Sequence, residues 1–574
     1  MSLIKRLSSL FSRPAGALLA ALLLPCLSSQ AQSAAPAWAW AVNSATPTAA
    51  VRVYGTAADA AGNVYVVGQI NGSGTFGATT LSNVTGAYVG KLNPAGQWEW
   101  LQTVPNASTF FPSYATDVAI DNAGNVLVGG FFTGTITAGS SPTITATGGN
   151  SGFVAKLDPS NRTWLWATRS AALFGSTHET IRGRGLAVDA ANNVAVSGSF
   201  SGSITLGSTS LTSINNTADM YVGKLNGSTG QWLWAVRAGG GGGDVASSVA
   251  TDPAGNVILT GMIEGQAPTA TVGSTMVTGA GSYDGLVARF AAATGVVEWA
   301  YAVGSPRSDN CNAAACDAQG NVYITGGFQS TVTLGSLTLN SDFLLRIDDI
   351  YVAKLSPSGQ WLWAVSGGGA SEDFGEDLQL DAAGNLYVAA TVRSSTPTFG
   401  SVTVSTPRRA AFVAHLLASN GAWQWVTSGG AAQPAYTYNL HLTAAPGGNP
   451  VYVTGTYSPS AVFGPINLAN NRTSYTPHFI AKLGSGPATG VRGSQAAAPL
   501  GAWPNPVAAG RMLQLPFGGE LRLLDALGRE TAHTLLPASF PTWPVPVQLA
   551  PGSYTVLLTA PSGKLYRQQL LVTQ

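Results

Sequence analysis

Apolar and polar positions alternate along most of this chain, in short runs that turn residues separate. Residues 317–365 show the pattern most fully, because they open with DAQGNVYITGG and close with DIYVAKLSPSGQWLWAV. In the Asp-x-x-Gly-Asn turn, the Asp carboxylate accepts bonds from nearby backbone amides, while Gly and Asn tolerate positive φ. In the closing Trp-x-Trp, the strand period of 2 places both indoles on one side. The pattern therefore predicts antiparallel strands that pack against a neighbouring sheet.

The pattern recurs at a nearly constant interval. The turn asparagines are separated by 62, 68, 63, 65, 64 and 64 residues, and they are Asn63, Asn125, Asn193, Asn256, Asn321, Asn385 and Asn449. Such a period is typical of a β-propeller blade, although it exceeds the commonest blades by roughly 15–25 residues. We expect the excess between the second and third strands of each copy, where residues 331–341 have the pattern of a small hairpin.

The two ends of the repeated region are complementary. Residues 38–42 (WAWAV) copy the last strand of a repeat before any turn has appeared, whereas the seventh copy ends at Leu483 without a Trp-x-Trp strand. Because closed β architectures leave no unpaired edge, we expect residues 38–42 to pair with residues 479–483. The predicted fold is all-β, a seven-bladed β-propeller closed by an N-terminal strand and followed by a small C-terminal β-sandwich.

Composition divides the chain into four parts. Residues 1–31 have the basic start, short apolar run and small residues of a secretory signal peptide, and the run is too short to span a bilayer. The propeller is expected over residues 32–484, and an Ala/Gly-rich linker over residues 485–499. Residues 500–574 alternate between glycine turns and predict the sandwich. No transmembrane segment is expected in the mature chain.

Charge and cysteine content narrow the function classes. Charged residues make up 9% of the chain and the formal net charge is +1, so we expect no nucleic-acid partner. Beyond the signal region the cysteines are Cys311 and Cys316, too few for a disulfide framework. The sequence favours buried thiols, with a local disulfide as the alternative.

The units from Asp121 to Leu157 and from Asp317 to Leu355 carry Asp-x-x-Gly-Asn and Lys-Leu at matching places. They resemble the bacterial seven-bladed β-propeller repeat family, over about residues 38–484. The resemblance implies a scaffold or interaction role and transfers no catalytic residue. Four positions depart from the family pattern, and they are Asn192 and Ala445 in the turns and Arg289 and His415 in place of Lys.

Three motifs occur in order near the C-terminus. They are Pro-Asn-Pro, Asp-x-x-Gly-Arg and Leu-x-x-Gly-x-Tyr, formed by Pro504, Asn505, Pro506, Asp525, Gly528, Arg529, Gly552 and Tyr554. These motifs resemble the type A C-terminal sorting domain of the type IX secretion system. The resemblance implies that the type IX machinery recognises residues 500–574 and exports the chain, via the periplasm, to the outer cell surface or the medium.

Few residues have the spacing of a catalytic or metal site. The histidines lack a zinc-ligand spacing, and one indole pair per repeat favours interblade core over a sugar platform. Seven acidic residues gather in the fifth insertion and the loop after it, and they are Asp342, Asp348, Asp349, Glu372, Asp373, Glu376 and Asp377. Repulsion among these carboxylates would favour a hard cation, so a Ca²⁺ site is one hypothesis and a solvated acidic loop is the alternative.

Two functions remain open at this point. The sequence favours a non-enzymatic surface or secreted propeller that binds a glycan or a protein, on the rim where the long loops gather. The alternative is an extracellular polysaccharide hydrolase or lyase, because paired carboxylates come together only in space. Three or more clustered Asp, Glu, His, Tyr or Arg side chains at the mouth of the central channel would favour the enzyme.

Overall fold

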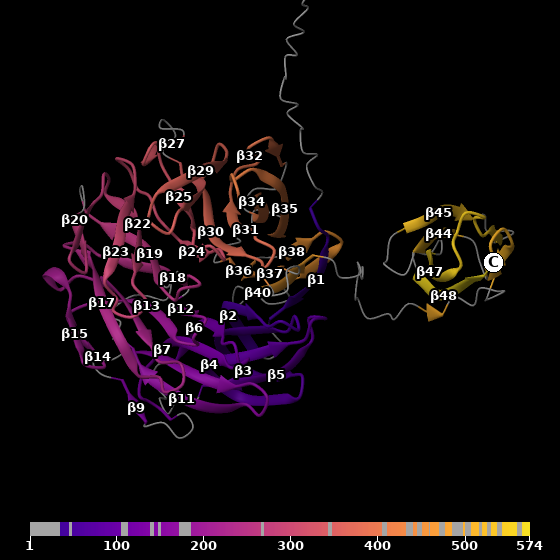
Figure 1. Cartoon of the computed structure of the whole chain (residues 1–574). Coiled ribbons are helices and arrows are strands. Elements are labelled where there is room, and N and C mark those ends of the chain that lie inside the picture. Colours follow the sequence, from indigo (N-terminus) through magenta and orange to yellow (C-terminus); the bar gives the residue numbers. More distant parts are fainter. Residues whose placement is uncertain are drawn as a thin grey trace, which may run out of the picture.

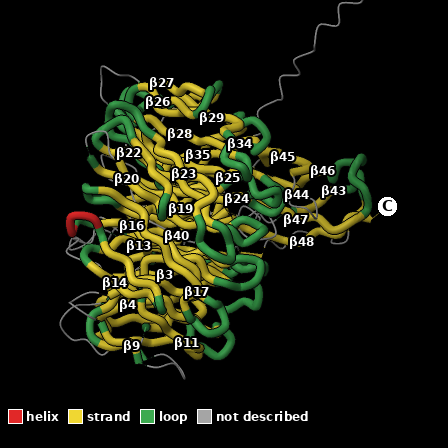
Figure 2. The backbone as a smooth tube through the Cα atoms, turned by 60° about the vertical axis from the view of Figure 1, so that its left-hand side comes forward, coloured by secondary structure: helices red, strands yellow, loops and turns green. Residues whose placement is uncertain are grey.

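The computed structural model of this chain is all-β. It describes residues 35–44, 49–104, 113–137, 143–146, 151–170, 185–265, 269–341, 347–404, 410–431, 440–444, 451–457, 460–469, 477–484, 498–499, 507–515, 519–524, 530–536, 542–559 and 565–573. Strands dominate these residues, as Figure 2 shows, and a short 3-10 segment, η1 (Ile214–Asn216), interrupts them. Within the same ranges no helix has the length and apolar character needed to cross a membrane.

Residues 38–483 repeat one unit of four antiparallel strands, each hydrogen-bonded to the next. Figure 1 shows these units arranged around a ring, with the first strand of each unit toward the centre. In chain order, the first unit is β2 (Ala49–Ala58), β3 (Val64–Phe76), β4 (Thr79–Leu92) and β5 (Trp98–Thr103), and the second is β6 (Tyr114–Ile120), β7 (Val126–Phe132), β10 (Ser151–Asp158) and β11 (Thr163–Arg169). The third is β12 (Leu186–Val188), β13 (Val194–Phe200), β16 (Asp219–Leu225) and β17 (Trp232–Gly240), the fourth is β18 (Val245–Thr251), β19 (Val257–Glu264), β22 (Tyr283–Phe290) and β23 (Val297–Val303), and the fifth is β24 (Ala313–Cys316), β25 (Val322–Phe328), β28 (Asp349–Leu355) and β29 (Trp361–Gly368). The sixth is β30 (Asp373–Leu380), β31 (Asn385–Val392), β34 (Ala410–Leu417) and β35 (Trp423–Ala431), and the last is β36 (His441–Ala444), β37 (Val451–Thr456), β40 (His478–Leu483) and β1 (Trp38–Asn43). We number them as the first to the seventh unit in this order.

The N-terminal strand completes the last unit. β1 pairs antiparallel with β40, and the register runs from Trp38 opposite Leu483 to Asn43 opposite Phe479. This pairing confirms the prediction for residues 38–42. It joins the two ends of the repeated region, so β40 keeps no open edge.

The extra residues of the repeat form small hairpins. These are β8 (Thr135–Ile136) with β9 (Ile144–Thr145), β14 (Ser203–Leu206) with β15 (Thr209–Thr212), β20 (Thr269–Val272) with β21 (Thr275–Thr278), β26 (Thr331–Leu334) with β27 (Leu337–Asn340), β32 (Thr398–Phe399) with β33 (Val402–Thr403), and β38 (Ser460–Phe463) with β39 (Ile466–Ala469). The β26–β27 hairpin confirms the prediction for residues 331–341. β20, β32 and β38 also pair with the outer strand of the preceding unit and cover its edge.

Apolar cores fill the spaces between neighbouring units. One cluster joins Tyr65 and Trp100 of the first unit to Val126 and Trp164 of the second. Trp100 and Trp164 are only 8% and 5% exposed, so these indoles belong to the interunit core, as the sequence predicts. Cys311 is also buried, and it and Cys316 are free thiols rather than a local disulfide.

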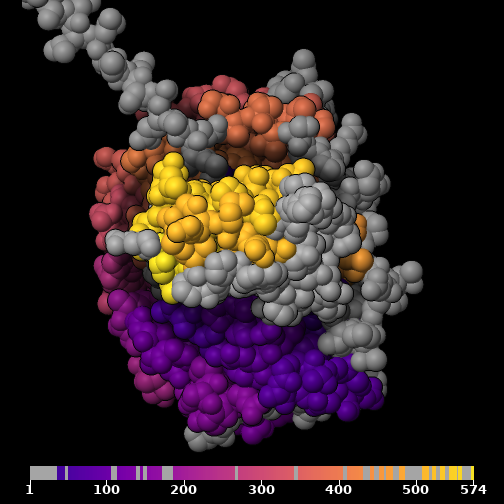
Figure 3. All heavy atoms as spheres, turned by 90° about the vertical axis from the view of Figure 1, so that its right-hand side faces the viewer, coloured from indigo at the N-terminus to yellow at the C-terminus, as the bar shows by residue number. Residues whose placement is uncertain are grey.

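A separate group of strands follows the ring. It contains β41 (Ala498–Pro499), β42 (Val507–Ala508), β43 (Met512–Gln514), β44 (Gly519–Leu524), β45 (Glu530–Leu536), β46 (Thr542–Pro544), β47 (Gly552–Thr559) and β48 (Leu565–Thr573). The larger sheet has the order β41-β48-β47-β44-β45, and β43 pairs with β46. Leu521 and Val556 of the larger sheet share one core with Leu513 and Trp543 of the smaller pair. Figure 3 shows these strands in yellow as one body.

Candidate functional site

The ring has two rims with different chemistry. Each third strand begins on one rim and ends on the other, so β16 has Asp219 at its start and Lys224 near its end. We call the rim at the ends of the third strands the turn rim, because the Asp-x-x-Gly-Asn turns lie there. We call the opposite rim, which carries the connections between units, the loop rim.

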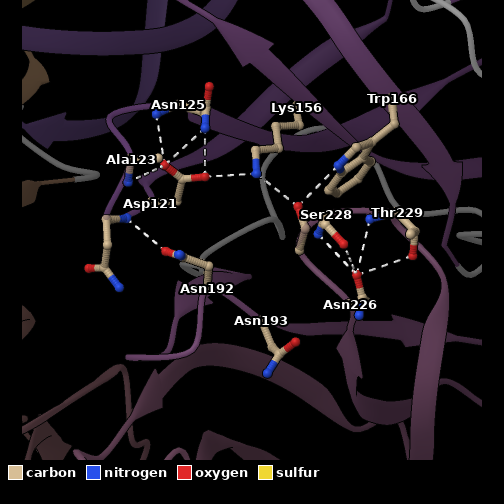
Figure 4. A network of polar contacts seen from close by, with 12 residues as sticks. Asp121, Ala123, Asn125, Lys156, Trp166, Asn192, Asn193, Asn226, Ser228 and Thr229 are labelled. Carbon is tan, nitrogen blue, oxygen red and sulfur yellow. Dashed lines mark hydrogen bonds and ion pairs between the residues drawn. The ribbon is translucent and has the colours of Figure 1, made fainter.

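The turn rim is built as the sequence predicts. Asp121 Oδ1 accepts hydrogen bonds from the backbone N–H groups of Ala123 (2.9 Å) and Asn125 (2.8 Å), so the carboxylate holds the turn closed. Asn192 replaces the turn glycine in the third unit and adopts a φ of 65°. Its side-chain oxygen accepts the N–H of Asn122 at 2.8 Å, which links two neighbouring turns (Figure 4). The departure from Gly is therefore tolerated here because Asn adopts positive φ.

A lysine and a tryptophan join each such turn to the next unit. Lys156 Nζ lies 2.7 Å from Asp121 Oδ2 and donates to the carbonyl of Gly227 in the third unit at 2.8 Å. Trp166 Nε1 donates to the same carbonyl at 3.2 Å (Figure 4). Gly230, with φ of 70°, lies against this indole, because a Cβ there would stand 2.6 Å from the ring. We call this arrangement the interunit clamp.

The clamp recurs at further interfaces. In each case a cation and the tryptophan at the position of Trp166 donate to one carbonyl, and the sets are Lys224 and Trp234 at Ala292, Arg289 and Trp299 at Pro357, Lys354 and Trp363 at Ala418, and Lys482 and Trp40 at Pro94. Arg289 therefore substitutes for Lys without loss of the contact. His415 does not, since neither of its ring nitrogens has a hydrogen-bond partner. Ala445, the remaining departure, lies outside the described residues.

Hydrogen bonds, with a neighbouring lysine, lower the pKa of two carboxyl groups at the turn rim. Burial acts to raise the pKa of Asp121, but hydrogen bonds from Lys156 and Asn125 outweigh it, and the pKa is lowered. Burial is again the largest influence on the pKa of Asp317 and acts to raise it. Hydrogen bonds from Asn321 and Tyr323, together with the charge of Lys354, outweigh burial and lower this pKa. These two carboxylates are therefore held by partners from the chain and contribute to the structure of the turn rim.

Some of the predicted acidic residues come together, because the Asp373 N–H donates to Asp348 O at 2.8 Å and a Cβ on Gly368 would meet both Asp349 Oδ1 and Asp373 Oδ2. Asp348 Oδ2 accepts from the Gln329 amide at 3.2 Å, and Glu372 forms an ion pair with Arg393. Asp373 accepts from the backbone N–H groups of Arg393 and Ser394 and from the Ser394 hydroxyl. These three carboxylates therefore fasten a loop to its neighbours.

The remaining predicted acids lie on strands or outside the described residues. Asp377, on the innermost strand β30, accepts the N–H of Leu442 in the next unit at 2.7 Å. Glu376 precedes it on β30, Asp349 begins β28, and Asp342 lies outside the described residues. Among the described residues no group of three or more His, Cys, Asp and Glu side chains is placed to hold a metal ion. The Ca²⁺ site therefore stays a prediction.

Buried aspartates instead meet in pairs at the loop rim. Asp219 at the start of β16 faces Asp244 in the following connection, and Asp284 at the same place in β22 faces Asp309. Burial raises the pKa of all four carboxyl groups, and raises those of Asp244 and Asp309 to about 6. Sequence reasoning missed these pairs.

A second group that sequence reasoning missed lies at the centre of the ring. Arg52 Nη1 donates to the Tyr54 hydroxyl at 3.4 Å, and both side chains are half-buried on the innermost strand β2. The ring of Tyr54 lies edge-on to His478 of the seventh unit (centroids 6.0 Å apart) and 6.4 Å from Tyr114 of the second. We call Arg52, Tyr54, Tyr114 and His478 the central cluster. It combines a cation with aromatic rings from the first, second and seventh units.

The electrostatics of the central cluster are asymmetric. The pKa of His478 is lowered to about 3, first by burial and second by the positive charge of Arg52. The imidazole is therefore neutral at neutral pH. Burial also raises the pKa of Tyr114. The sequence does mark these positions as different from other repeats, because Arg52 and Tyr54 stand where the fourth unit has Val245 and Ser247.

Of the sorting motif, the described residues include Gly552 and Tyr554. Gly552 is the first residue of β47 and Tyr554 is the third. The Tyr554 ring is buried, and its hydroxyl donates to the Ala550 carbonyl at 2.8 Å. Pro504, Asn505, Pro506, Asp525, Gly528 and Arg529 lie outside the described residues.

Comparisons with known proteins give no family for this chain. No family model matches it, and no curated protein matches it. Among solved structures, the quinohemoprotein alcohol dehydrogenase ADHIIG of Pseudomonas putida HK5 has a TM-score of 0.35 at 12% identity, covering 82% of this chain and 78% of its own. That of Comamonas testosteroni has a TM-score of 0.34 at 12% identity, covering 81% and 78%. A Bacteroides caccae protein of unknown function has a TM-score of 0.25 at 12% identity, covering 55% and 89%.

These TM-scores are too low to support an argument about function. The class of the protein therefore rests on its own sheets. They define an all-β protein of antiparallel four-stranded units in a propeller-like ring.

Proposed function

We propose that this protein is an exported binding module. The four-stranded units are the blades of one closed seven-bladed β-propeller, and residues 500–574 form a C-terminal β-sandwich that directs export. Supporting this proposal, backbone amides donate to Asp121 on the turn rim and to Asp373 on the loop rim, and Lys156 pairs with Asp121, which makes these carboxylates parts of a scaffold. A rigid ring that presents variable positions at its centre suits recognition.

The central cluster is the proposed ligand site, and an acidic glycan is the proposed ligand. The observation that carries this choice is the half-buried pair of Arg52 and Tyr54 between the rings of Tyr114 and His478. A guanidinium binds a carboxylate through paired hydrogen bonds. Aromatic side chains supply large, rigid apolar faces for the sugar rings beside it.

Glycan binding by point variants tests this site. On an array of neutral and uronic-acid glycans, we expect the wild type to retain acidic members, and Arg52→Ala to lose about tenfold in affinity or more, since a charged hydrogen bond contributes roughly 1.5–3 kcal/mol. Arg511→Ala removes one positive charge outside the ring and serves as the control. Equal losses in both variants, or binding to neutral glycans alone, would contradict the assignment.

A polysaccharide hydrolase or lyase is the second candidate, because the central cluster does gather Arg, Tyr and His side chains. A general acid or base works best with a pKa near the operating pH. His478, with its pKa of about 3, is poorly matched to that task. Release of new reducing ends or unsaturated ends from an acidic polysaccharide, abolished by Tyr114→Phe, would establish the enzyme instead.

The export proposal has its own test. Residues 500–574 are proposed to engage the type IX secretion machinery, with Tyr554 in the core of the module. A chain that ends at Pro499 should fold but accumulate in the periplasm of the native host, and residues 490–574 fused to an unrelated exported protein should carry it to the surface. A fusion that stays periplasmic while the native protein is exported would overturn the proposal.

A further inference from the structure

The aspartate pairs of the loop rim are buried and equivalent in successive units. Asp219, Asp244, Asp284 and Asp309 are each at most 1% exposed. The second member of each pair is fixed beside the first, because Asp244 N–H donates to Ala218 O at 2.6 Å and Asp309 N–H to Tyr283 O at 2.9 Å. Each pair therefore joins the third strand of one unit to the connection that begins the next.

One oxygen in each pair lacks a donor from the chain. Asp284 Oδ2 accepts the N–H groups of Ala280 and Gly281, and Asp309 accepts those of Ser305 and Gln329. Asp284 Oδ1 is buried and has no hydrogen-bond partner. A buried acceptor without a donor costs about 1–3 kcal/mol, so this oxygen needs an explanation.

The equivalent pair shows what faces such an oxygen. Asp219 Oδ1 is also buried without a partner. A Cβ on Gly239 would stand 3.0 Å from this oxygen and 2.6 Å from Asp244 Oδ2, so two acceptors from different residues face one small space. A carboxyl oxygen becomes a donor once it binds a proton. One proton would therefore convert two opposed acceptors into a hydrogen bond.

The two pairs differ in their charged neighbours. Arg237 Nη1 lies 2.6 Å from Asp219 Oδ2, and Glu264, which accepts from Tyr283, acts on Asp244. In the next unit Ala302 occupies the register position of Arg237. The groups that face Asp309 there are Tyr351 and, beside it, the Cys311 thiol, both neutral near pH 7 because burial raises their pKa values. Among the described residues, no Lys or Arg forms an ion pair with Asp284 or Asp309.

We propose that Asp284 and Asp309 hold one proton between them in mildly acidic surroundings, and that this proton latches the fourth unit to the fifth. When the pH rises, the O–H bond breaks and the proton passes to solvent water. Two buried carboxylates then oppose each other with no cation from the chain between them, and the connection at residues 304–309 loses its fastening. The latch is thus a pH-sensitive contact of the loop rim.

The direction of the pH effect follows from the pKa values. Burial first, and then the charge of Asp284, raises the pKa of Asp309 to about 6, above the usual range of an aspartate. A carboxyl group with a raised pKa in the folded state contributes its full stability below the unfolded pKa and loses it as pH rises through about 6. The wild type should therefore have a lower melting temperature at about pH 8 than at about pH 5.

The variant Asp284→Asn tests the latch. Its amide oxygen can keep the bonds from Ala280 and Gly281, and its NH₂ group stands where Oδ1 was and donates toward Asp309 at every pH. We expect it to melt about 2–4 °C above the wild type at about pH 8 and to lose that advantage at about pH 5. Asp158→Asn is the control, since hydrogen bonds from Ser160 lower the pKa of that partly exposed carboxyl group. A difference between Asp284→Asn and the wild type that stays constant with pH would overturn the latch.

Two further measurements keep the test decisive. Infrared spectra of the wild type should show a protonated-carboxyl band at about pH 5 that fades as pH rises through about 6 and that is smaller in Asp284→Asn. If the variant fails to fold, absence of this band from the wild type at about pH 5 would overturn the proposal. If Ca²⁺ at about pH 8 raises the melting temperature as far as acid does, the pair binds a cation and the proton latch is wrong.

Discussion

The two ends of strand β16 place buried carboxylates beside different neighbours. On β16, Lys224 lies 2.7 Å from Asp189 at the turn rim, and the side chains of both are 3% exposed. At the loop rim the same strand begins with Asp219, which faces a second aspartate, Asp244. The pKa is lowered for Asp121 and Asp317 on the turn rim and raised for the loop-rim pairs. Asp121 is 5% exposed, whereas the loop-rim aspartates are at most 1% exposed, and burial there outweighs even the Arg237 guanidinium beside Asp219. Burial and the donors around a carboxylate together decide the sign of its pKa shift.

This contrast makes the two rims respond to pH in opposite directions. Carboxylates with lowered pKa values contribute stability that is lost as pH falls, whereas those with raised values contribute stability that is lost as pH rises through about 6. Acid therefore loosens the turn rim and base loosens the loop rim. We expect the greatest stability at mildly acidic pH.

Removal of the N-terminal strand should break the turn-rim contacts most severely. Trp40 Nε1 and Lys482 Nζ both donate to Pro94 O, so the clamp at this junction depends on a residue of β1. Deleting residues 33–42 also exposes the edge of β40, and we expect a loss above the ~3–5 kcal/mol of one buried tryptophan. The measurement is urea unfolding, with deletion of residues 33–36 as the control. An unchanged unfolding midpoint in the longer deletion would refute closure by β1.

Substitution of a single clamp lysine should have the next largest effect on stability. Lys224→Met leaves Asp189 as a buried charge without its partner, and we expect a loss of about 3–5 kcal/mol in the free energy of unfolding. Lys91→Met is the matched control, because Lys91 pairs with Glu99 while their side chains are 20% and 38% exposed. We expect about 0–1 kcal/mol there. Similar losses in the two variants would show that the clamp lysines matter for packing rather than charge.

Local turn chemistry and strand alternation made much of the ring predictable. The Asp-x-x-Gly-Asn turns, the buried indoles, the β26–β27 hairpin and the pairing of β1 with β40 each follow from residues close in sequence or from the two incomplete ends. The sites were not predictable in this way. Asp284 and Asp309 are distant in sequence and meet through strand register, and the central cluster draws on the first, second and seventh units. The Ca²⁺ hypothesis for the acidic run at 342–377 stays a prediction, because Asp342 lies outside the described residues.

Glycine substitutions should separate backbone strain from the tryptophan contact. Gly230 has φ of 70° and Gly124 has φ of 83°, so alanine is strained at both, at a cost of about 1–2 kcal/mol. A Cβ on Gly230 would also meet Trp166 at 2.6 Å, whereas a Cβ on Gly124 would meet nothing within 4 Å. We therefore expect Gly230→Ala to cost about 1–3 kcal/mol more than Gly124→Ala in urea unfolding. Equal costs for the two variants would show that the contact between Gly230 and the Trp166 indole does not contribute to the clamp.

The smallest expected effect is a gain, at the unit where the clamp lacks its cation. His415 stands at the lysine position of the sixth unit, and its pKa is lowered, first by burial, so it is neutral at neutral pH beside Asp381. Its ring nitrogens have no hydrogen-bond partner. His415→Lys should place an ammonium group near the Asp381 carboxylate, as Lys354 lies near Asp317, and raise the free energy of unfolding by about 0.5–1 kcal/mol. His415→Met is the control for the added chain length, and urea unfolding at neutral pH is the measurement. If the lysine variant is no more stable than the methionine variant, the stacking of His415 on Tyr387 and Trp425 outweighs the restored ion pair.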